Sequence, residues 1–340
     1  MSKINNLFIG NEENYHKIIN NFKSNILSNS NILYGDRGIG KSTFVHHFSL
    51  NIFNYLSEKE KNFNSFDHRL HIQNRTHPNL YVIDRLINEK NNKLNNHITI
   101  DQIRNLENFI NKSSLINLPK IILIDNADNL NQNSSNALLK LLEEPKKNTY
   151  FFLISHQISS LIPTLRSRCI KFLFEKLEYA EFIKIINYAN LDIEENNLLF
   201  LYDITNGSPG LSLEYYDNEI YNDFFNIIEL FKEEIQLNSK LADFSEHISK
   251  KNNEQFNFFL FIFKFILINI IKINFGSNLN NKFKSNILNS LLEISNIISL
   301  DKCMRSLEYI NNNQKNVNIY NLDKKLFILN LFSSNYSNYE

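Results

Sequence analysis

A glycine-rich segment between an apolar run and a helical pattern restricts the fold more than any other part of the chain. Residues 35–42 have the sequence GDRGIGKS and match the pattern G-x-x-x-x-G-K-S/T. The apolar run 31–34 precedes them directly, and a helical pattern begins at Lys41. Glycines let such a loop turn tightly, so that backbone N–H groups point at phosphate oxygens. The spacing therefore predicts a phosphate-binding loop in an α/β fold.

The residue types in this loop predict a nucleotide site. Lys41 is expected to reach the β- and γ-phosphates, and Ser42 is expected to bind Mg²⁺. The predicted cofactor is ATP or ADP with Mg²⁺. The alternative is a glycine-rich turn that no longer binds nucleotide, but the intact lysine and serine favour binding. The loop residues assigned to the nucleotide are Gly35, Gly38, Gly40, Lys41, Ser42 and Thr43.

A second strand supplies the other half of the site. Residues 121–124 are apolar and end in Asp125, where P-loop proteins place the carboxylate that holds Mg²⁺. Asp125 is therefore expected to complete the Mg²⁺ site together with Ser42. The next residue is Asn126, and an uncharged amide is a poor general base. The sequence predicts nucleotide binding without efficient hydrolysis.

Two further polar residues belong to the same region. Asp128 is either a cap for the turn that enters the next helix or a catalytic carboxylate, and capping is favoured. Ser155 ends the predicted strand 150–155, where such folds often place a side chain that senses the γ-phosphate. A plain serine at a strand end explains this residue equally well.

The first half of the chain predicts a parallel sheet with helices on both faces, because short apolar runs alternate with helical patterns. The predicted strands are 31–34, 80–83, 120–124, 150–155 and 169–174, and the predicted helices are 41–56, 99–116 and 134–144. Ser134 or Ser135 is expected to cap the last of these helices, and Pro145 to end it. After Lys176 the pattern is helical to the end, with a Gly-Ser-Pro-Gly break at 207–210.

Composition limits the function further. The 36 basic and 36 acidic side chains cancel, so no global positive field marks a solitary nucleic-acid binder. Two cysteines, Cys169 and Cys303, fit a reduced cytosolic protein better than a disulfide scaffold. The N-terminus has no sustained apolar segment typical of a signal peptide, and a cytoplasmic location is expected.

An apolar segment at 258–275 is about long enough to cross a bilayer. Lys264 and Lys272 interrupt it, and their spacing of eight residues puts them on one side of a helix. We therefore expect a helix buried among others rather than a membrane span. Lys264 and Lys272 are expected to face water, and Phe261 and Ile268 to be buried.

The segment Pro163–Cys169 contains Arg166 and Arg168, which should project in different directions from a short loop. One can pack while the other reaches the γ-phosphate held by a neighbouring subunit, as an arginine finger does. The alternative is a pair of surface salt bridges. Cys169 is expected to pack at the start of a buried strand rather than to act as a nucleophile with His156.

Several of these segments together resemble the AAA+ subunits of the bacterial DNA polymerase III clamp loader. The segments are GDRGIGKS, NALLKLLEEP, PTLRSRC and GSPG, and the resemblance covers at least residues 20–215. The sequence DNAD at 125–128 resembles the members that lack the glutamate of the motor subunits. HPNL at 77–80 and IDQIR at 100–104 are similar to the same members.

The resemblance implies three domains and a set of partners. The domains would be a RecA-like nucleotide-binding domain at 1–174, a helical lid at 175–215 and a helical collar at 216–340. The partners would be the gamma/tau and delta subunits in a hetero-pentamer that loads the sliding clamp onto primed DNA. Arg168 would act at the ATP site of an adjacent gamma/tau subunit. The rival interpretations are an active gamma/tau-type motor ATPase and a nucleotide-free scaffold.

Two positions depart from the pattern of that family. Many members have a zinc module with four cysteines, whereas residues 57–79 contain none. His68, His71 and His77 remain there, and we expect solvated histidines without a zinc site. Gly210 stands where motor subunits resemble one another in having a sensor-2 arginine, so nucleotide-driven closure of the lid is expected to be weak.

Overall fold

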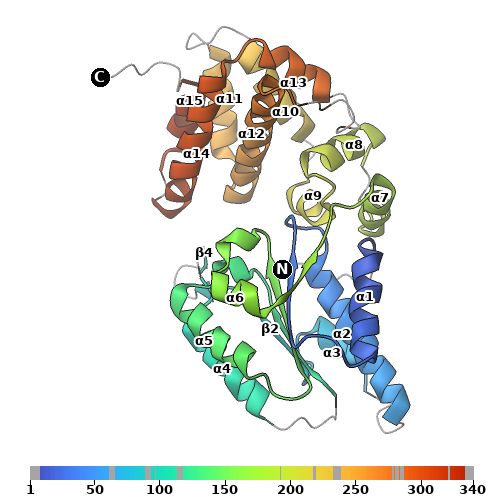
Figure 1. Cartoon of the computed structure of the whole chain (residues 1–340). Helices are drawn as coiled ribbons and strands as arrows, with labels where there is room; N and C mark the ends of the chain where they lie inside the picture. Colours follow the sequence, from blue (N-terminus) through green and yellow to red (C-terminus); the bar gives the residue numbers. More distant parts are fainter. Residues whose placement is uncertain are drawn as a thin grey trace. The chain divides into compact units, whose positions relative to one another are not determined.

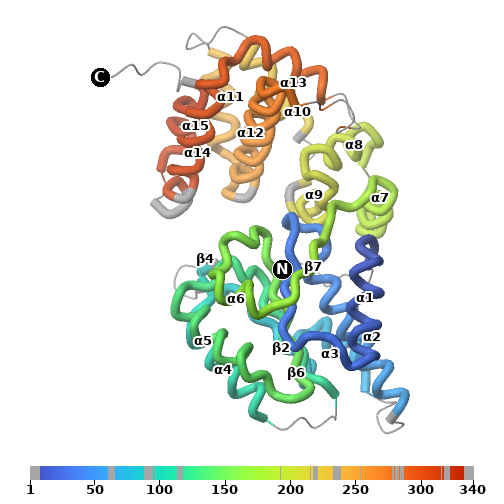
Figure 2. The backbone as a smooth tube through the Cα atoms, in the orientation of Figure 1, coloured from blue at the N-terminus to red at the C-terminus, as the bar shows by residue number. Residues whose placement is uncertain are grey.

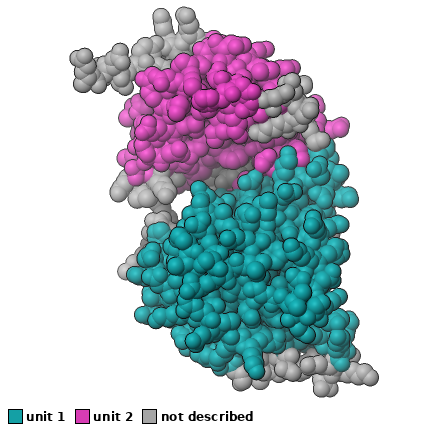
Figure 3. Space-filling view, viewed as in Figure 1, with its two compact units in different colours: residues 1–189, 208–210 teal, residues 190–207, 211–340 magenta. Residues whose placement is uncertain are grey.

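The computed structural model divides the chain into two compact units, shown in different colours in Figure 3. The first unit contains residues 1–189 and 208–210, and the second contains residues 190–207 and 211–340. This division differs from the boundaries at 174 and 215, so the three-domain organisation stays a prediction. The residues described are 8–60, 66–88, 93–95, 97–112, 118–191, 193–216, 220–232, 239–277, 279, 283, 287–320 and 322–333.

The first unit is built on a five-stranded parallel sheet (Figure 1). Each strand pairs in parallel with its neighbours, which confirms the predicted fold class. The central strands are apolar and buried, as strands are when helices cover both faces of a sheet. In spatial order the strands are β2 (Leu80–Ile83), β5 (Lys120–Ile124), β6 (Thr149–Ser155), β1 (Ser30–Tyr34) and β7 (Ile170–Leu173).

Helices cover both faces of this sheet, as Figures 1 and 2 show. One face is covered by α1 (Glu12–Lys23), α2 (Lys41–Glu60) and α3 (His68–Gln73), and the other by α4 (Ile100–Asn111), α5 (Gln132–Glu143) and α6 (Pro163–Arg168). Successive residues of a strand point to opposite faces. Accordingly Phe152 packs in the core beneath α2, and Phe151 packs in the core beneath α4 and α5.

Helix α5 begins earlier than the sequence predicted. Its N-cap is Asn131, whose side chain accepts a 2.9 Å hydrogen bond from the Ser134 backbone N–H. The predicted cap at Ser134 or Ser135 is therefore wrong, because asparagine caps equally well and both serines lie inside the helix. Helix α4 has Thr99 and Gln102 as a reciprocal capping pair. It ends at Asn111, and the rest of its predicted length lies partly outside the described residues.

The chain between and after these elements contains several short ones. A small antiparallel hairpin is formed by β3 (Ile87–Asn88) and β4 (Lys93–Leu94). Two 3₁₀ turns, η1 (Ala127–Asn129) and η2 (Ile158–Ser160), follow β5 and β6. Helix α7 (Tyr179–Tyr188) closes the main part of the first unit.

All elements in the described residues of the second unit are helices, as the sequence predicted. The Gly-Ser-Pro-Gly break separates α8 (Glu195–Ile204) from α9 (Pro209–Tyr215), and the first two residues of α9 belong to the first unit. The remaining helices are α10 (Ile220–Lys232), α11 (Ser239–Lys250), α12 (Asn253–Asn274), α13 (Ile287–Ser295), α14 (Leu300–Tyr320) and α15 (Lys324–Ser333).

Helix α12 is the apolar segment that the sequence singled out. Among the described residues it is the one helix long and apolar enough to span a membrane, and 56% of its most apolar window is buried inside the protein. Phe256, Phe259 and Phe263 are almost fully buried and form ring contacts with side chains on α11 and α15. Burial of this kind is typical of the core helix of a helical bundle.

The predicted faces of α12 are partly wrong. Lys264 is half-buried and donates a 2.9 Å hydrogen bond to the Gln314 side chain on α14, so it does not belong to a stripe in water. Ile268, which we expected to be buried, is 41% exposed. The spacing of two lysines did not identify the solvent face because an amide on a distant helix satisfies one of them.

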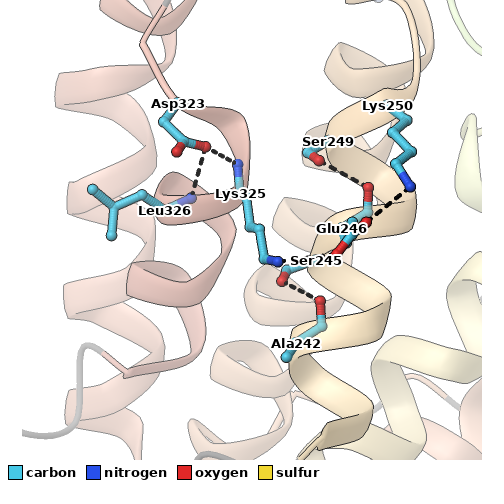
Figure 4. A network of polar contacts seen from close by, with 8 residues as sticks. All are labelled: Ala242, Ser245, Glu246, Ser249, Lys250, Asp323, Lys325 and Leu326. Carbon is cyan, nitrogen blue, oxygen red and sulfur yellow. Dashed lines mark hydrogen bonds and ion pairs between the residues drawn. The ribbon is translucent and has the colours of Figure 1, made fainter.

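Polar contacts at the ends of the helices also join the bundle (Figure 4). Glu246 on α11 contacts Lys250 at 2.9 Å and Lys325 on α15 at 3.1 Å. These charges are exposed, so each pair contributes little to stability. The ion pair between Lys251 and Asp223 is different, because it measures 2.6 Å and both side chains are less than 10% exposed. Removing one partner would take this ion pair away from a charge that stays buried.

Two of the three histidines of the loop and helix after α2 are buried and not solvated as we expected. His68 and His77 are less than 5% exposed, and their rings share a 2.9 Å contact between Nδ1 of His68 and Nε2 of His77. The Asn79 backbone N–H donates to Nδ1 of His77, and Nε2 of His68 contacts the Ser57 hydroxyl. His77 also stacks on Phe53 at 4.2 Å. Two buried neutral rings thus satisfy each other here.

Lysine substitutions on α12 test which of its side chains are buried and which contact water. Phe263→Lys should destabilise the protein by several kcal/mol, because the new ammonium would be buried without a partner. Ile268→Lys is the matched control and should change the free energy of unfolding by about 0.5 kcal/mol or less, since this side chain already contacts water. Urea unfolding followed by circular dichroism measures both. Equal losses for the two variants would contradict the burial described here.

Acid should destabilise the fold through the buried histidine pair. Burial and the neighbouring His68 lower the pKa of His77 to about 3, so the native ring stays neutral, whereas the unfolded ring takes up a proton near its ordinary pKa. The stabilisation is present above about pH 6.5 and is lost as the pH falls towards 3, by about 1–2 kcal/mol at pH 5.

The slope of stability against pH isolates this contribution. His77→Gln should lower stability at pH 7 and flatten the dependence between pH 7 and pH 5. Chemical denaturation at a series of pH values measures the slope. An unaltered slope in His77→Gln would show that the pair does not couple folding to protonation.

Candidate nucleotide-binding site

The phosphate-binding loop is closed around its own lysine. Lys41 is the first residue of α2 and is 3% exposed. Its ammonium group donates to the backbone carbonyls of Gly35 at 2.7 Å and Asp36 at 2.6 Å. An ammonium has three N–H donors, so the loop's own carbonyls account for two of them. The lysine is therefore held at the start of the helix with its charge inside the loop.

The charge of Lys41 lacks full compensation. Burial lowers the pKa of Lys41 to about 8, although the carboxylates of Asp125, Asp36 and Asp128 act in the opposite direction. A buried cation in this state favours the approach of an anion. Phosphate oxygens at the N-terminus of α2 would supply the missing negative charge. The local electrostatics therefore fit the predicted nucleotide.

The glycines of the loop are required by its conformation. Gly35, Gly38 and Gly40 have φ values of 144°, 79° and 98°, a region that other residues rarely adopt. At Gly35 a Cβ atom would also lie 2.2 Å from the backbone oxygen of Phe174. The loop could not adopt this path with larger residues at these positions.

The two predicted Mg²⁺ ligands lie together. The Ser42 side chain forms a hydrogen bond with Asp125 at the end of β5, and this bond and the charge of Lys41 lower the pKa of the carboxyl. Burial and the nearby carboxylate of Asp84 outweigh them and raise it. A hydroxyl and a carboxylate are oxygen ligands of the kind that Mg²⁺ prefers, with the remaining positions filled by water and phosphate. In the described part of the chain no group of three or more histidine, cysteine or acidic side chains could hold a metal ion alone.

Asp84 is a site residue that the sequence analysis missed. It follows β2 directly, and β2 is the neighbour of β5 in the sheet. Carboxyl ends of adjacent parallel strands meet at one edge, which is where α/β proteins bind ligands. An aspartate directly after the predicted strand 80–83 was the available signal. Its position became informative only when the strand order was known.

Asn126 occupies the position after the Mg²⁺ ligand and is held from two sides. Its side-chain oxygen lies 2.5 Å from Nε2 of His156, and its amide nitrogen donates to Asp84 at 3.4 Å. Burial, followed by the charge of Lys41, lowers the pKa of His156 to about 4, so this ring is neutral near pH 7. Neither the amide nor this weakly basic ring is suited to remove a proton from water.

Asp128 organises the chain after β6 and does not cap α5, so the predicted capping role is wrong. It accepts hydrogen bonds from the Ser155 hydroxyl at 2.7 Å, the His156 backbone N–H at 2.6 Å and the Ser160 hydroxyl at 2.8 Å. Three donors on one carboxylate favour a structural role over a catalytic one. Ser155 is fully buried and directed at Asp128, and its contact with a γ-phosphate stays a prediction.

The arginine segment is a helix, α6, and not the loop that we expected. Pro163 at its first position suits a helix start, and residues two apart on a helix still point in different directions. Arg168 is exposed, with its guanidinium 2.5 Å from Glu143 and 3.2 Å from the Thr164 carbonyl. Arg166 is only partly exposed, and its Nε atom is buried. Arg168 therefore lies at the surface, and Arg166 packs against its own domain.

Cys169, at the end of α6, packs as the sequence predicted. The side chain is buried in the same core cluster as Leu138 and Leu165. Burial raises the pKa of its thiol to about 11, so the thiolate needed for nucleophilic chemistry does not form near pH 7. The residue contributes to packing.

These features define the class of the protein. A phosphate-binding loop between β1 and α2 faces an aspartate at the end of a parallel strand, within a sheet covered on both faces. This is a P-loop nucleotide-binding fold of the AAA+ type.

Comparison with known proteins identifies the family. A family model described as DNA polymerase III, delta subunit, matches residues 10–178. The DNA polymerase III subunit delta′ of Buchnera aphidicola subsp. Baizongia pistaciae is 27% identical over 350 residues, covering 96% of this chain and 100% of that protein. That of Pseudomonas aeruginosa is 34% identical over 140 residues, 41% of either chain. The chain belongs to the family of DNA polymerase III delta-prime subunits.

Two further comparisons concern a eukaryotic protein and a solved structure. Replication factor C subunit 5 of Mus musculus is 33% identical over 92 residues, which cover 26% of this chain and 27% of that protein. The solved gamma-subunit-related protein of Thermotoga maritima aligns along 98% of both chains at 18% identity. Its TM-score of 0.40 is too low to define a common fold for the whole chain.

Proposed function

We propose that this protein is the clamp-loader subunit that retains a nucleotide site but does not turn nucleotide over efficiently. The observation behind this proposal is the position of Asn126, held between His156 and Asp84 beside an intact phosphate-binding loop. Lys41 provides the charge for ATP or ADP, and Ser42 and Asp125 provide oxygen ligands for Mg²⁺. The group that would activate water is missing.

The partners follow from family membership. We propose a hetero-pentamer with gamma/tau and delta subunits that works in the cytoplasm and loads the sliding clamp onto primer-template DNA. The helices of residues 216–340 would form the collar that joins the subunits. Contact with the clamp and the DNA would be indirect. Because the formal charges of the chain cancel, any DNA contact would be local or shared with other subunits.

Arg168 is proposed to act at the ATP site of the adjacent gamma/tau subunit. Its side chain is 37% exposed, and its ion pair with Glu143 is half-exposed as well. Such a pair contributes about 0–1 kcal/mol, so little free energy opposes its exchange for a phosphate. A planar guanidinium stabilises the charge that develops on a transferring phosphoryl group.

One observation favours the rival interpretation, an active gamma/tau-type motor. Asp84 places a carboxylate next to Asn126, at the end of the adjacent strand. A carboxylate there could orient water in place of the missing glutamate. We favour the inactive site because Asp84 already accepts from the Arg85 backbone N–H and the Asn126 side chain. The nucleotide-free scaffold is opposed by the uncompensated charge of Lys41.

Turnover separates the two interpretations. The isolated protein should bind ATP and ADP weakly, lose binding in Lys41→Ala, and hydrolyse ATP far more slowly than ordinary enzymes. Asn126→Glu alone should not restore turnover, because Gly210 provides no arginine. Steady-state phosphate release measures hydrolysis. A rate of about 1 s⁻¹ or more would favour the motor, and loss of that rate in Asp84→Asn would assign it to Asp84.

Arg168→Ala should leave this protein folded with unchanged nucleotide affinity, and should lower ATP hydrolysis and clamp loading by the reconstituted complex. A complete arginine finger contributes on the order of 10³–10⁵ in rate at its own site. The loss measured for the complex should be partial, because one motor site among several borders this subunit. Arg168→Lys should resemble alanine, since a point charge does not reproduce the planar fork.

Two controls accompany this measurement. Glu143→Gln removes the ion-pair partner of Arg168 and should not lower hydrolysis, because it releases the guanidinium. Arg166→Ala should have the smaller effect on hydrolysis, since Arg166 packs against its own domain. Wild-type loading by the Arg168→Ala complex would remove the arginine-finger proposal.

A further inference from the structure

The N-terminal end of α9, together with Ser208 before it, contacts the phosphate-binding loop directly. The Ser208 hydroxyl donates to the backbone carbonyl of Arg37 at 2.7 Å. The Gly210 backbone N–H donates to the carbonyl of Gly38 at 2.9 Å. Residues 208–210 belong to the same compact unit as the loop, although 171 positions separate Ser208 from Arg37. The contacts thus join the Gly-Ser-Pro-Gly segment at 207–210 to the glycine-rich segment at 35–42.

The contact is tight enough to determine the residue at position 210. A Cβ atom on Gly210 would lie 2.7 Å from the backbone oxygen of Gly38 and 2.8 Å from its Cα atom. Both are backbone atoms of the loop, which cannot move aside as a flexible side chain can. Gly210 is not among the residues with positive φ, so space and not backbone conformation requires glycine here. Ser208 is fully buried.

With these two contacts, every carbonyl from residue 35 to residue 38 accepts a hydrogen bond. Lys41 donates to the first two, and residues 208–210 donate to the other two. A peptide plane whose carbonyl is fixed has its N–H direction fixed as well. The loop N–H groups are the groups that bind phosphate.

We propose that Ser208 and Gly210 are positioning residues of the nucleotide site. They hold the carbonyls of Arg37 and Gly38 so that the loop is already shaped for phosphate before nucleotide arrives. This inference rests on the proposed nucleotide binding and adds residues to it. It also explains why position 210 has no sensor-2 arginine. Any side chain there would push residues 208–210 away from the loop.

Hydrogen exchange of the nucleotide-free protein tests the hold on the loop. Ser208→Ala should raise amide exchange of residues 35–41, because one carbonyl loses its donor. Ser208→Thr keeps the hydroxyl and should restore the wild-type rate. Ser212→Ala is the matched control, since Ser212 is equally buried and its hydroxyl contacts Thr205. Exchange that is the same in Ser208→Ala and wild type would overturn the inference.

Calorimetric binding of Mg²⁺-ADP to the full chain tests the consequence for the site. Ser208→Ala should weaken affinity about three- to tenfold, the effect of losing one hydrogen bond. Ser208→Thr should recover affinity, and Gly210→Ala should weaken it more than tenfold. If Ser208→Ala raises amide exchange but leaves the affinity for Mg²⁺-ADP unchanged, the contact holds the loop without contributing to binding. This result would also overturn the inference.

The two measurements keep this inference separate from the proposed function. If wild-type protein does not bind Mg²⁺-ADP, the proposed function fails, and exchange in Ser208→Ala still decides whether residues 208–210 hold the loop. If wild-type protein binds Mg²⁺-ADP and Ser208→Ala matches it in both measurements, the inference fails and the proposed function stands. Should Gly210→Ala not fold, the Ser208 variants still decide the outcome.

Discussion

The buried ammonium of Lys41 is the constraint on which the site depends. A charge removed from water must be surrounded by acceptors, and here the acceptors are the first carbonyls of the glycine-rich loop together with nearby carboxylates. The loop can wrap the lysine only because its glycines adopt positive φ. The apolar strand before it and the buried helix after it hold both ends in place. The buried lysine therefore requires the strand, the glycine-rich loop and the helix together.

Binding and hydrolysis make different demands on this framework, so one can persist without the other. Binding needs the loop amides, the lysine and oxygen ligands for the metal ion, all of which follow from the path of the backbone. Hydrolysis additionally needs a base at the end of β5, where Asn126 contacts His156 instead. An amide in this position keeps the hydrogen-bonded packing of the site and lacks the proton acceptor. The proposed function, a holder of nucleotide rather than a motor, rests on this difference.

The sequence predicted those parts of the fold that depend on local pattern. All five strands of the main sheet were found within two residues, because buried parallel strands are short apolar runs bounded by turns. One-turn elements such as α6 were missed, since six residues hold too little periodicity. Contacts between distant segments were missed as well: Asp84 beside Asp125, His68 with His77, and Lys264 with Gln314. A single sequence does not show which polar groups satisfy one another across the fold.

Positions 126 and 210 show why restoring a motor would take more than one substitution. At position 126 the obstacle is chemical, because a carboxylate there would lie beside Asp84, whose charge, together with burial, already raises the pKa of Asp125. At position 210 the obstacle is steric, because any side chain meets the backbone of the loop. A change at either position leaves the other obstacle in place and disturbs contacts that now stabilise the site. The two departures from the motor pattern are therefore parts of one stable arrangement.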